Sequence, residues 1–97
     1  MAFIQIVEFR TSQFEQMRAV AEEWEKATEA KRKARRRVIV QDRDNPGRYS
    51  IIVFFDSYEE AMDNSALPET DALSKKMMGF ADGPPTFHNL DVVDDRE

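Results

Sequence analysis

The amino-acid sequence predicts an α+β fold of the ferredoxin-like type, a β-α-β-β-α-β chain whose four-stranded antiparallel sheet carries its helices on one face. Three observations predict it. Four segments are rich in β-branched and aromatic residues, helical spacing separates the first from the second and the third from the fourth, and 97 residues suit one domain. We expect that domain to span residues 1–97, with residues 94–97 as a frayed acidic tail.

The first half of the chain predicts a strand, a long helix and a second strand. Residues 3–9, FIQIVEF, are strand-forming types. A helix is expected from about Gln13 to the low thirties, begun by a capping box of Ser12 and Glu15. Its apolar stripe has helical spacing and consists of Phe14, Met17, Ala21, Trp24 and Thr28. Residues 37–43, RVIVQDR, are the second strand.

The second half predicts a hairpin, two helical pieces and a last strand. The turn sequence DNPG at residues 44–47 leads into a third strand at residues 49–55, YSIIVFF. Ser57 begins a short helix through a second capping box, and a further helix has Pro68 at its first position. Two prolines then stop the helix, and residues 84–93, PPTFHNLDVV, contain the fourth strand.

Both faces of the predicted sheet are apolar. In the third strand one face carries Tyr49, Ile51, Val53 and Phe55, and the other carries Ser50, Ile52 and Phe54. The helices can cover one face, but monomers seldom leave a large contiguous apolar surface open to water. A second copy related by two-fold symmetry is the simplest cover for the other face. We therefore expect a homodimer whose sheets pack face to face as an α/β barrel; a monomer with an apolar sheet is the alternative.

Composition limits the classes of function. The chain has no cysteine and one histidine, which excludes disulfides, thiolate metal sites and a multi-histidine metal site within one chain. There is no glycine-rich phosphate loop either, so we expect no cofactor. No apolar run approaches the length of a membrane span, and the first residues lack the pattern of a signal peptide. A soluble cytoplasmic protein without a membrane partner is expected.

The basic run AKRKARRR at residues 30–37 is the most unusual feature of the charge distribution. It holds six basic residues, whereas the remainder of the chain has eight basic and 19 acidic residues, a net charge of −11. That remainder repels phosphate groups, so we expect no nucleic-acid binding. The run is interpreted as the solvated end of the long helix, where cations complement the helix dipole. An anionic ligand or partner is the alternative.

Four segments carry a resemblance to known proteins that covers nearly the whole chain: FIQIVEF, FFDSYEEAM, NSALPETDAL and ADGPPTFHNLDVV. They resemble the antibiotic-biosynthesis-monooxygenase-like families of the dimeric α/β-barrel superfamily. The resemblance implies that fold and a ligand between the sheet and the helices of each subunit. Its members include cofactor-independent monooxygenases acting on aromatic polyketides. Relatives often carry histidines around the proline of NSALPE, where this chain has Asn64 and Glu69, which weakens any transfer of imidazole chemistry.

Four residues are candidates for a functional site. His88 lies in the last predicted strand, and histidine is the side chain that titrates closest to neutral pH. It is a candidate base for a phenolic substrate, whose phenolate can react with O₂; a strand histidine with local hydrogen bonds is the alternative. Trp24 and Tyr49 are candidate pocket walls, and Asn64 a candidate for an orienting hydrogen bond. For both aromatic residues, structural packing is the alternative.

The sequence therefore predicts a protein that binds a small, largely apolar or aromatic molecule. The family resemblance implies its enzymatic form, a cofactor-independent monooxygenase acting on an aromatic or polyketide-like substrate. A non-enzymatic binding or regulatory protein on the same scaffold is the alternative. A cavity of about 300 Å³ or more with a base at its wall favours the enzyme, and a filled core favours the alternative.

Overall fold

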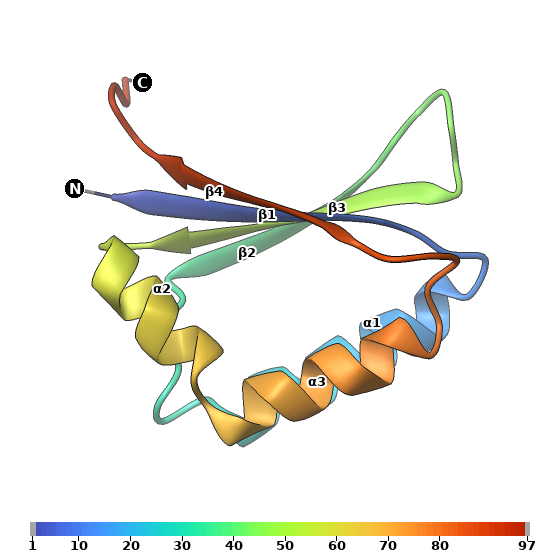
Figure 1. Ribbon diagram of the computed structural model, residues 1–97, viewed down its shortest axis with the longest axis horizontal. Coiled ribbons are helices and arrows are strands. Elements are labelled where there is room, and N and C mark those ends of the chain that lie inside the picture. Colours follow the sequence, from blue (N-terminus) through green and yellow to red (C-terminus); the bar gives the residue numbers. More distant parts are fainter. Residues whose placement is uncertain (1, 97) are drawn as a thin grey trace.

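The computed structural model describes residues 2–96, and these form one four-stranded antiparallel sheet with helices on one face (Figure 1). In chain order the elements are β1 (Phe3–Arg10), α1 (Phe14–Ala27), β2 (Arg36–Gln41), β3 (Arg48–Phe55), α2 (Tyr58–Ser65), α3 (Pro68–Met78) and β4 (Thr86–Asp91). The strand order in the sheet is β2-β3-β1-β4. This arrangement confirms the predicted ferredoxin-like fold, with the second helical region divided into α2 and α3.

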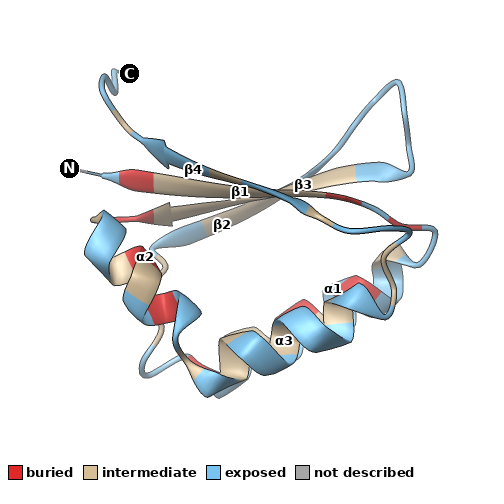
Figure 2. Cartoon of the chain, viewed as in Figure 1, coloured by how far each residue is buried: buried red, intermediate tan, exposed pale blue. Residues whose placement is uncertain are grey.

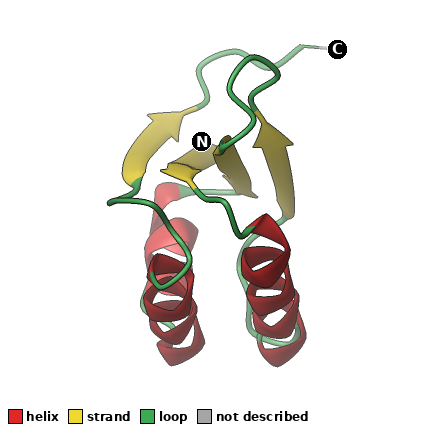
Figure 3. Ribbon diagram, turned by 90° about the vertical axis from the view of Figure 1, so that its right-hand side faces the viewer, coloured by secondary structure: helices red, strands yellow, loops and turns green. Residues whose placement is uncertain are grey.

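The strand register determines which side chains share a face of the sheet. Val7 of β1 lies opposite Ile51 of β3 and Phe87 of β4, and these side chains point toward the helices. Ile6 lies opposite Ile52 and His88, so those three residues point away from the helices. Figure 3 shows that the helices lie on one side of the sheet only. The other side, here called the outer face, has no cover from the described residues.

The packed core lies at one end of the molecule, where α2 meets the sheet. Phe3, Phe55 and Ala61 form a buried cluster there, and Tyr58 adds an edge-to-face contact to the Phe3 ring at 5.4 Å between centroids. In Figure 2 the buried residues gather at this junction and along part of α1. Helices α1 and α3 pack mainly on each other, while α2 packs on β1 and β3. The sheet and the α1–α3 pair therefore enclose space between them.

The long helix ends earlier than the sequence predicts. Helix α1 stops at Ala27, and the buried Thr28 donates its hydroxyl to the Trp24 carbonyl at 2.7 Å. Most of the basic run is thus a connection, and the interpretation of residues 30–36 as helical is wrong. Tertiary contacts override the helical pattern: the Arg35 amide donates to the Phe54 carbonyl at 2.7 Å, which starts the alignment of β2 with β3.

The two predicted capping boxes differ in outcome. Ser57 accepts a hydrogen bond from the Glu60 amide at 3.2 Å, so the Ser57 part of the second box is confirmed. The box of Ser12 and Glu15 is wrong, because α1 has no side-chain cap at Gln13. Instead the buried Thr11 hydroxyl accepts from the Gln13 amide at 2.9 Å. A buried hydroxyl just before the helix replaces the exposed one expected to cap it.

The remaining predictions concern the proline start of α3, the chain end and membrane spans. Pro68 opens α3, as predicted. Residues 94–96 have no regular secondary structure, and Glu97 of the predicted tail lies outside the described residues. Within residues 2–96, no helix combines the length and apolarity that crossing a membrane requires.

Candidate functional site

A cavity of ≈ 730 Å³ lies between the sheet and the α1–α3 pair. Its volume falls in the range of about 300–1,000 Å³ typical of small-molecule sites. Apolar side chains form most of its wall, among them Val7, Phe9, Met17, Ile51, Met77 and Phe87. The cavity exists because α1 and α3 hold each other away from the sheet, so that the apolar stripes of both helices face a space instead of a filled core.

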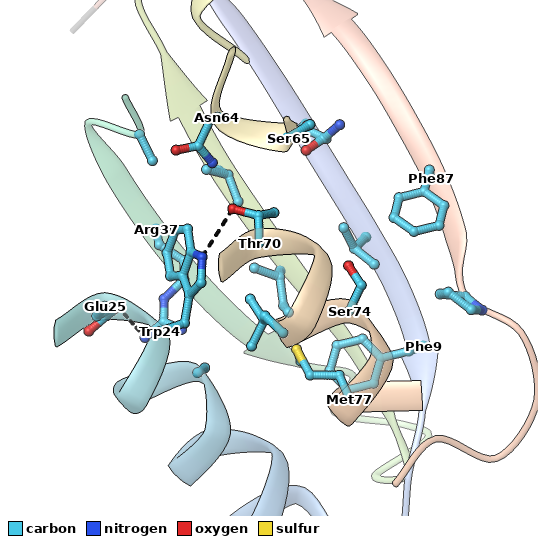
Figure 4. Close-up of a pocket in the computed structure, with 18 of the residues that line it drawn as sticks. Phe9, Trp24, Glu25, Arg37, Asn64, Ser65, Thr70, Ser74, Met77 and Phe87 are labelled. Atoms are coloured by element: carbon cyan, nitrogen blue, oxygen red, sulfur yellow. Dashed lines mark hydrogen bonds and ion pairs between the residues drawn. The ribbon is translucent and has the colours of Figure 1, made fainter. Parts of the chain in front are cut away.

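Six of the polar residues of the wall define what is called here the polar end of the cavity: Trp24, Glu25, Arg32, Arg37, Asn64 and Thr70. Ser74 lies farther along α3, toward Met77 (Figure 4). Figure 4 shows Trp24, Glu25, Arg37 and Thr70 together, away from Phe9, Met77 and Phe87. Trp24 donates its indole N–H to the Thr70 hydroxyl at 3.1 Å, which ties α1 to α3. The Arg37 guanidinium pairs with the Glu25 carboxylate, with 2.6 Å between Nη2 and Oε1. The cavity is therefore amphipathic along its length.

Asn64 joins the polar end to the connection between α1 and β2. Its side chain is buried, and its Oδ1 accepts a hydrogen bond from the Lys33 amide at 3.1 Å. That bond holds the basic run beside α2, and Arg32 lies over the Trp24 ring, 5.6 Å from its centroid. The connection is thus fixed to the site by side-chain contacts, which brings its arginines to the cavity wall.

A second clamp holds the same connection to α3. Lys31 forms an ion pair with Glu69 in the first turn of that helix. The hydrogen bond from Lys31 lowers the pKa of the Glu69 carboxyl below its usual 4.5. The Oε1 atom of Glu69 is buried and has no hydrogen-bond partner among the described residues. The ion pair therefore fixes the connection at Lys31, and the hydrogen bond to Asn64 fixes it again at Lys33.

The structure brings two of the four candidate residues to the cavity. Trp24 and Asn64 both line it. Tyr49 instead stacks on Phe14, with ring centroids 4.4 Å apart, and borders a separate cleft of ≈ 360 Å³. His88 lies on the outer face, where its Nε2 is 3.5 Å from the Glu8 carboxylate. Phe87, the residue before it, takes the cavity side of the strand.

Both acidic side chains of the cavity wall form ion pairs with basic side chains. Glu25 pairs with Arg37, and Asp71 pairs with Lys75 one turn along α3 at 3.0 Å. Histidine is absent from the cavity wall within residues 2–96. The same residues contain no group of three or more metal-ligating side chains. The wall thus offers hydrogen-bond donors and apolar surface, without an unpaired carboxylate or imidazole.

The sequence alone did not single out Arg37, Arg32 or Glu25 as site residues. Arg32 was assigned to a solvated helix end, and Arg37 was assigned to the start of the second strand without a role in a site. A signal was nevertheless present at Arg37. It alternates with Ile39 in β2, so it shares the face of an apolar residue, and a strand arginine on such a face contacts the interior.

Comparisons with known proteins confirm the fold. No family model matches the sequence, and no curated protein matches it either. Solved structures match over nearly the whole chain. A proposed antibiotic biosynthesis monooxygenase from Caulobacter crescentus has a TM-score of 0.82 at 12% identity, covering 96% of this chain and 91% of that one. SnoaB from Streptomyces nogalater, a cofactor-independent oxygenase, was solved as a variant and has a TM-score of 0.82 at 9% identity, covering 97% and 95%.

A third solved structure gives the same result. Rv0793 from Mycobacterium tuberculosis has a TM-score of 0.81 at 14% identity, and the match covers 100% of both chains. All these identities are low, so the matches show how the chain is folded and leave its chemistry to be argued from its own residues. The fold that the sequence resemblance implied is confirmed, and the protein shares its ferredoxin-like fold with these three structures.

Proposed function

We propose that the protein binds a small, largely apolar or aromatic molecule in the cavity between the sheet and the α1–α3 pair. The observation that carries the proposal is the cavity itself, ≈ 730 Å³ with a mostly apolar wall and a polar end. Binding sites for small molecules have this composition, a hydrophobic and aromatic lining with a few placed polar groups. Met17 and Met77 suit such a site, because methionine adapts to ligands of irregular shape.

The enzymatic form of the proposal is a cofactor-independent monooxygenase. It is supported by the shared fold with SnoaB, a cofactor-independent oxygenase. In such a reaction an activated CH₂ group of a phenolic or enolic substrate loses a proton, and the electron-rich anion reduces O₂. One oxygen atom becomes the new carbonyl and the other leaves in water, so the substrate supplies all four electrons. The protein needs to hold the substrate, exclude water and favour the anion.

The base for such a reaction is the weak point of the enzymatic form. The catalytic role predicted for His88 stays a prediction, and its position on the outer face gives that role no route to the cavity within one chain. Both wall carboxylates are paired with cations. This observation favours the second candidate, a non-enzymatic binding or regulatory protein that uses the same cavity.

We also propose that the outer face is covered by a second copy of the chain. Ile6, Ile52 and Phe54 lie on it, and Leu90 and Val40 are 44% and 42% exposed. Such a surface suits isologous pairing of the two sheets. In the dimer the cavities remain on the far sides of the two sheets, so each subunit keeps a binding site of its own.

One experiment separates the two candidate functions. Metal-free protein is incubated with a panel of polycyclic phenols in air and under nitrogen, and oxygen consumption and products are followed. Oxygen uptake above the protein-free rate, with one oxygen atom in the product, supports the monooxygenase. Binding of panel members without oxygen uptake supports the binding protein. If no member binds at millimolar concentration, the cavity is not a site for aromatic molecules and the proposal fails.

A further inference from the structure

The polar end of the cavity contains an arginine in an unusual position. Arg37 projects from β2 on the helix-facing side, opposite Val53 of β3, and only 22% of its side chain is exposed. Its ion pair joins Nη2 to Oε1 of Glu25. A guanidinium has five N–H donors in a planar fork that fits a carboxylate bidentately. Arg37 therefore retains donors that can face an occupant of the cavity.

A second arginine lies beside it. Arg32 is held over the face of Trp24, and its Nη1 donates to the Glu25 backbone carbonyl at 3.2 Å. These contacts hold its guanidinium at the cavity wall without neutralising it with a carboxylate. The cation is thus placed by an aromatic face and a carbonyl, and its charge remains available.

The charge balance of the wall follows from where each ion points. Arg35 pairs with Asp56, and Arg36 lies over Phe54 of the outer face. At the polar end itself, Arg32 and Arg37 meet the single carboxylate of Glu25. One positive charge is left over in a partly enclosed space, where screening by solvent is weaker than on the surface. Phe9, Met77 and Phe87, which lie away from Arg37 in Figure 4, are uncharged.

We propose that the ligand is an amphipathic anion, a flat apolar body bearing one carboxylate, with the carboxylate on Arg37 and Arg32. The apolar body then lies against Phe9, Met77 and Phe87. Glu25 competes with the ligand carboxylate for Arg37 and keeps the guanidinium oriented while the site is empty. The inference rests on the proposed function, since it assigns a ligand class to the same cavity. It also gives Arg32 and Arg37 of the basic run a role, that of an anion receptor.

The test compares naphthalene-carboxylate with its neutral carboxamide, which has nearly the same shape. Binding is measured by isothermal titration calorimetry, with quenching of Trp24, the chain's single tryptophan, as a second readout. The intact protein is expected to bind the acid at least tenfold more tightly than the amide. Charge-assisted hydrogen bonds are strong enough for a preference of about 10- to 100-fold.

Two variants at the polar end are expected to act in opposite directions. Arg37→Gln removes the receptor, so the acid should lose its preference while amide binding changes by less than about twofold. Glu25→Gln removes the competing carboxylate, so acid binding should tighten by severalfold. Arg18→Gln is the matched control, because it deletes the same charge on the exposed surface of α1, where Arg18 pairs with Glu22. It should bind both ligands as the unmodified protein does.

The measurements distinguish a failure of the anion inference from a failure of the proposed binding function. If the unmodified protein binds acid and amide equally, the cavity proposal stands and the anion inference is overturned. If the acid preference survives in Arg37→Gln and is unchanged in Glu25→Gln, the receptor assigned to this pair is overturned. If neither ligand binds at millimolar concentration, the binding function fails together with the inference. Thermal unfolding of each variant shows whether a loss of binding comes from loss of the fold.

Discussion

The two faces of the sheet are similar in apolar content and differ in what lies over them. The helix-facing side chains of β1 and β3, such as Val7 and Ile51, line a cavity because α1 and α3 rest on each other instead of on the sheet. The outer side chains, such as Ile6 and Ile52, lie on the side of the sheet that no helix of residues 2–96 covers (Figure 3). Apolarity alone therefore does not identify a binding site. We propose that the covered but unfilled face holds the ligand and that the uncovered face pairs with a second copy of the chain.

The largest expected effect comes from a substitution on the outer face, which should dissociate the proposed dimer. Ile52→Asp places a carboxylate at the centre of the proposed dimer interface, opposite Ile6 and Val38. An uncompensated charge in such a place costs about 3–5 kcal/mol, so the dissociation constant of the dimer should rise about 100-fold or more. Light scattering at micromolar concentration measures it. Ala72→Asp on the exposed surface of α3 is the control and should keep the mass of two chains.

A dimer that persists in Ile52→Asp would mean that the copies pair through another surface. A one-chain mass for the unmodified protein, independent of concentration, would remove the dimer altogether.

The next effect concerns the side of the sheet that carries the helices. Asn64→Ala removes the buried side-chain oxygen that accepts the Lys33 amide hydrogen bond. Because that amide then lacks its partner, the free energy of unfolding should fall by about 1–3 kcal/mol. For a domain of this size each kcal/mol shifts Tm by about 4–8 °C. Asn89→Ala makes the same substitution on exposed β4, where Asn89 accepts from Gln5. It should change stability by no more than about 0.5 kcal/mol; equal losses in both variants would contradict the role given to Asn64.

A smaller effect uses two neighbours on opposite faces. Phe87 lines the cavity and His88 points outward. Phe87→Ala should weaken naphthalene-carboxylate binding about 2- to 10-fold, the range of one aromatic contact. His88→Ala should leave the affinity within about twofold. Calorimetry on both variants tests the assignment of faces in β4, and a reversed order of effects would show that His88 reaches the site.

The smallest effect is a pH dependence at the clamp between Lys31 and Glu69. The folded-state pKa of Glu69 is lowered, so its pair adds stability above the ordinary pKa of 4.5 and loses it as the pH falls through the folded value. The difference in Tm between the unmodified protein and Glu69→Gln should therefore shrink as the pH falls below 4.5. A difference that stays constant down to pH 2 would show that the ion pair adds nothing and that Glu69 acts by packing alone.

Strand composition and the turn sequence were enough to predict the fold. β-Branched and aromatic runs mark all four strands, and Pro68 marks the start of α3. The end of α1 was not predictable in the same way, because helical spacing continues past Ala27 and the chain leaves the helix for contacts with Asn64 and Phe54. Those partners are distant in sequence, so no local pattern contains them.

The site was predictable only in part, and strand parity explains the difference. Trp24 lies on the apolar stripe of a helix, and that stripe must face the sheet, so its place at the cavity follows from periodicity. In β4 both Phe87 and Leu90 are apolar and face opposite ways, so composition does not say on which face His88 lies. Only the register against Ile6 decides it. Arg37 was missed for the related reason that its partner, Glu25, comes from another element.

The chain segments at the apolar end of the cavity are joined by hydrogen bonds to backbone carbonyls. The Thr11 amide donates to the Gly47 carbonyl at 3.0 Å, the Asp82 amide donates to Arg10 at 2.7 Å, and the Thr11 hydroxyl donates to Phe80 at 2.6 Å. In amide hydrogen exchange these loop positions should therefore be protected like strand residues, in contrast to ordinary loops, which open with little free energy. The apolar end of the cavity is thereby expected to open no more readily than the strands that flank it.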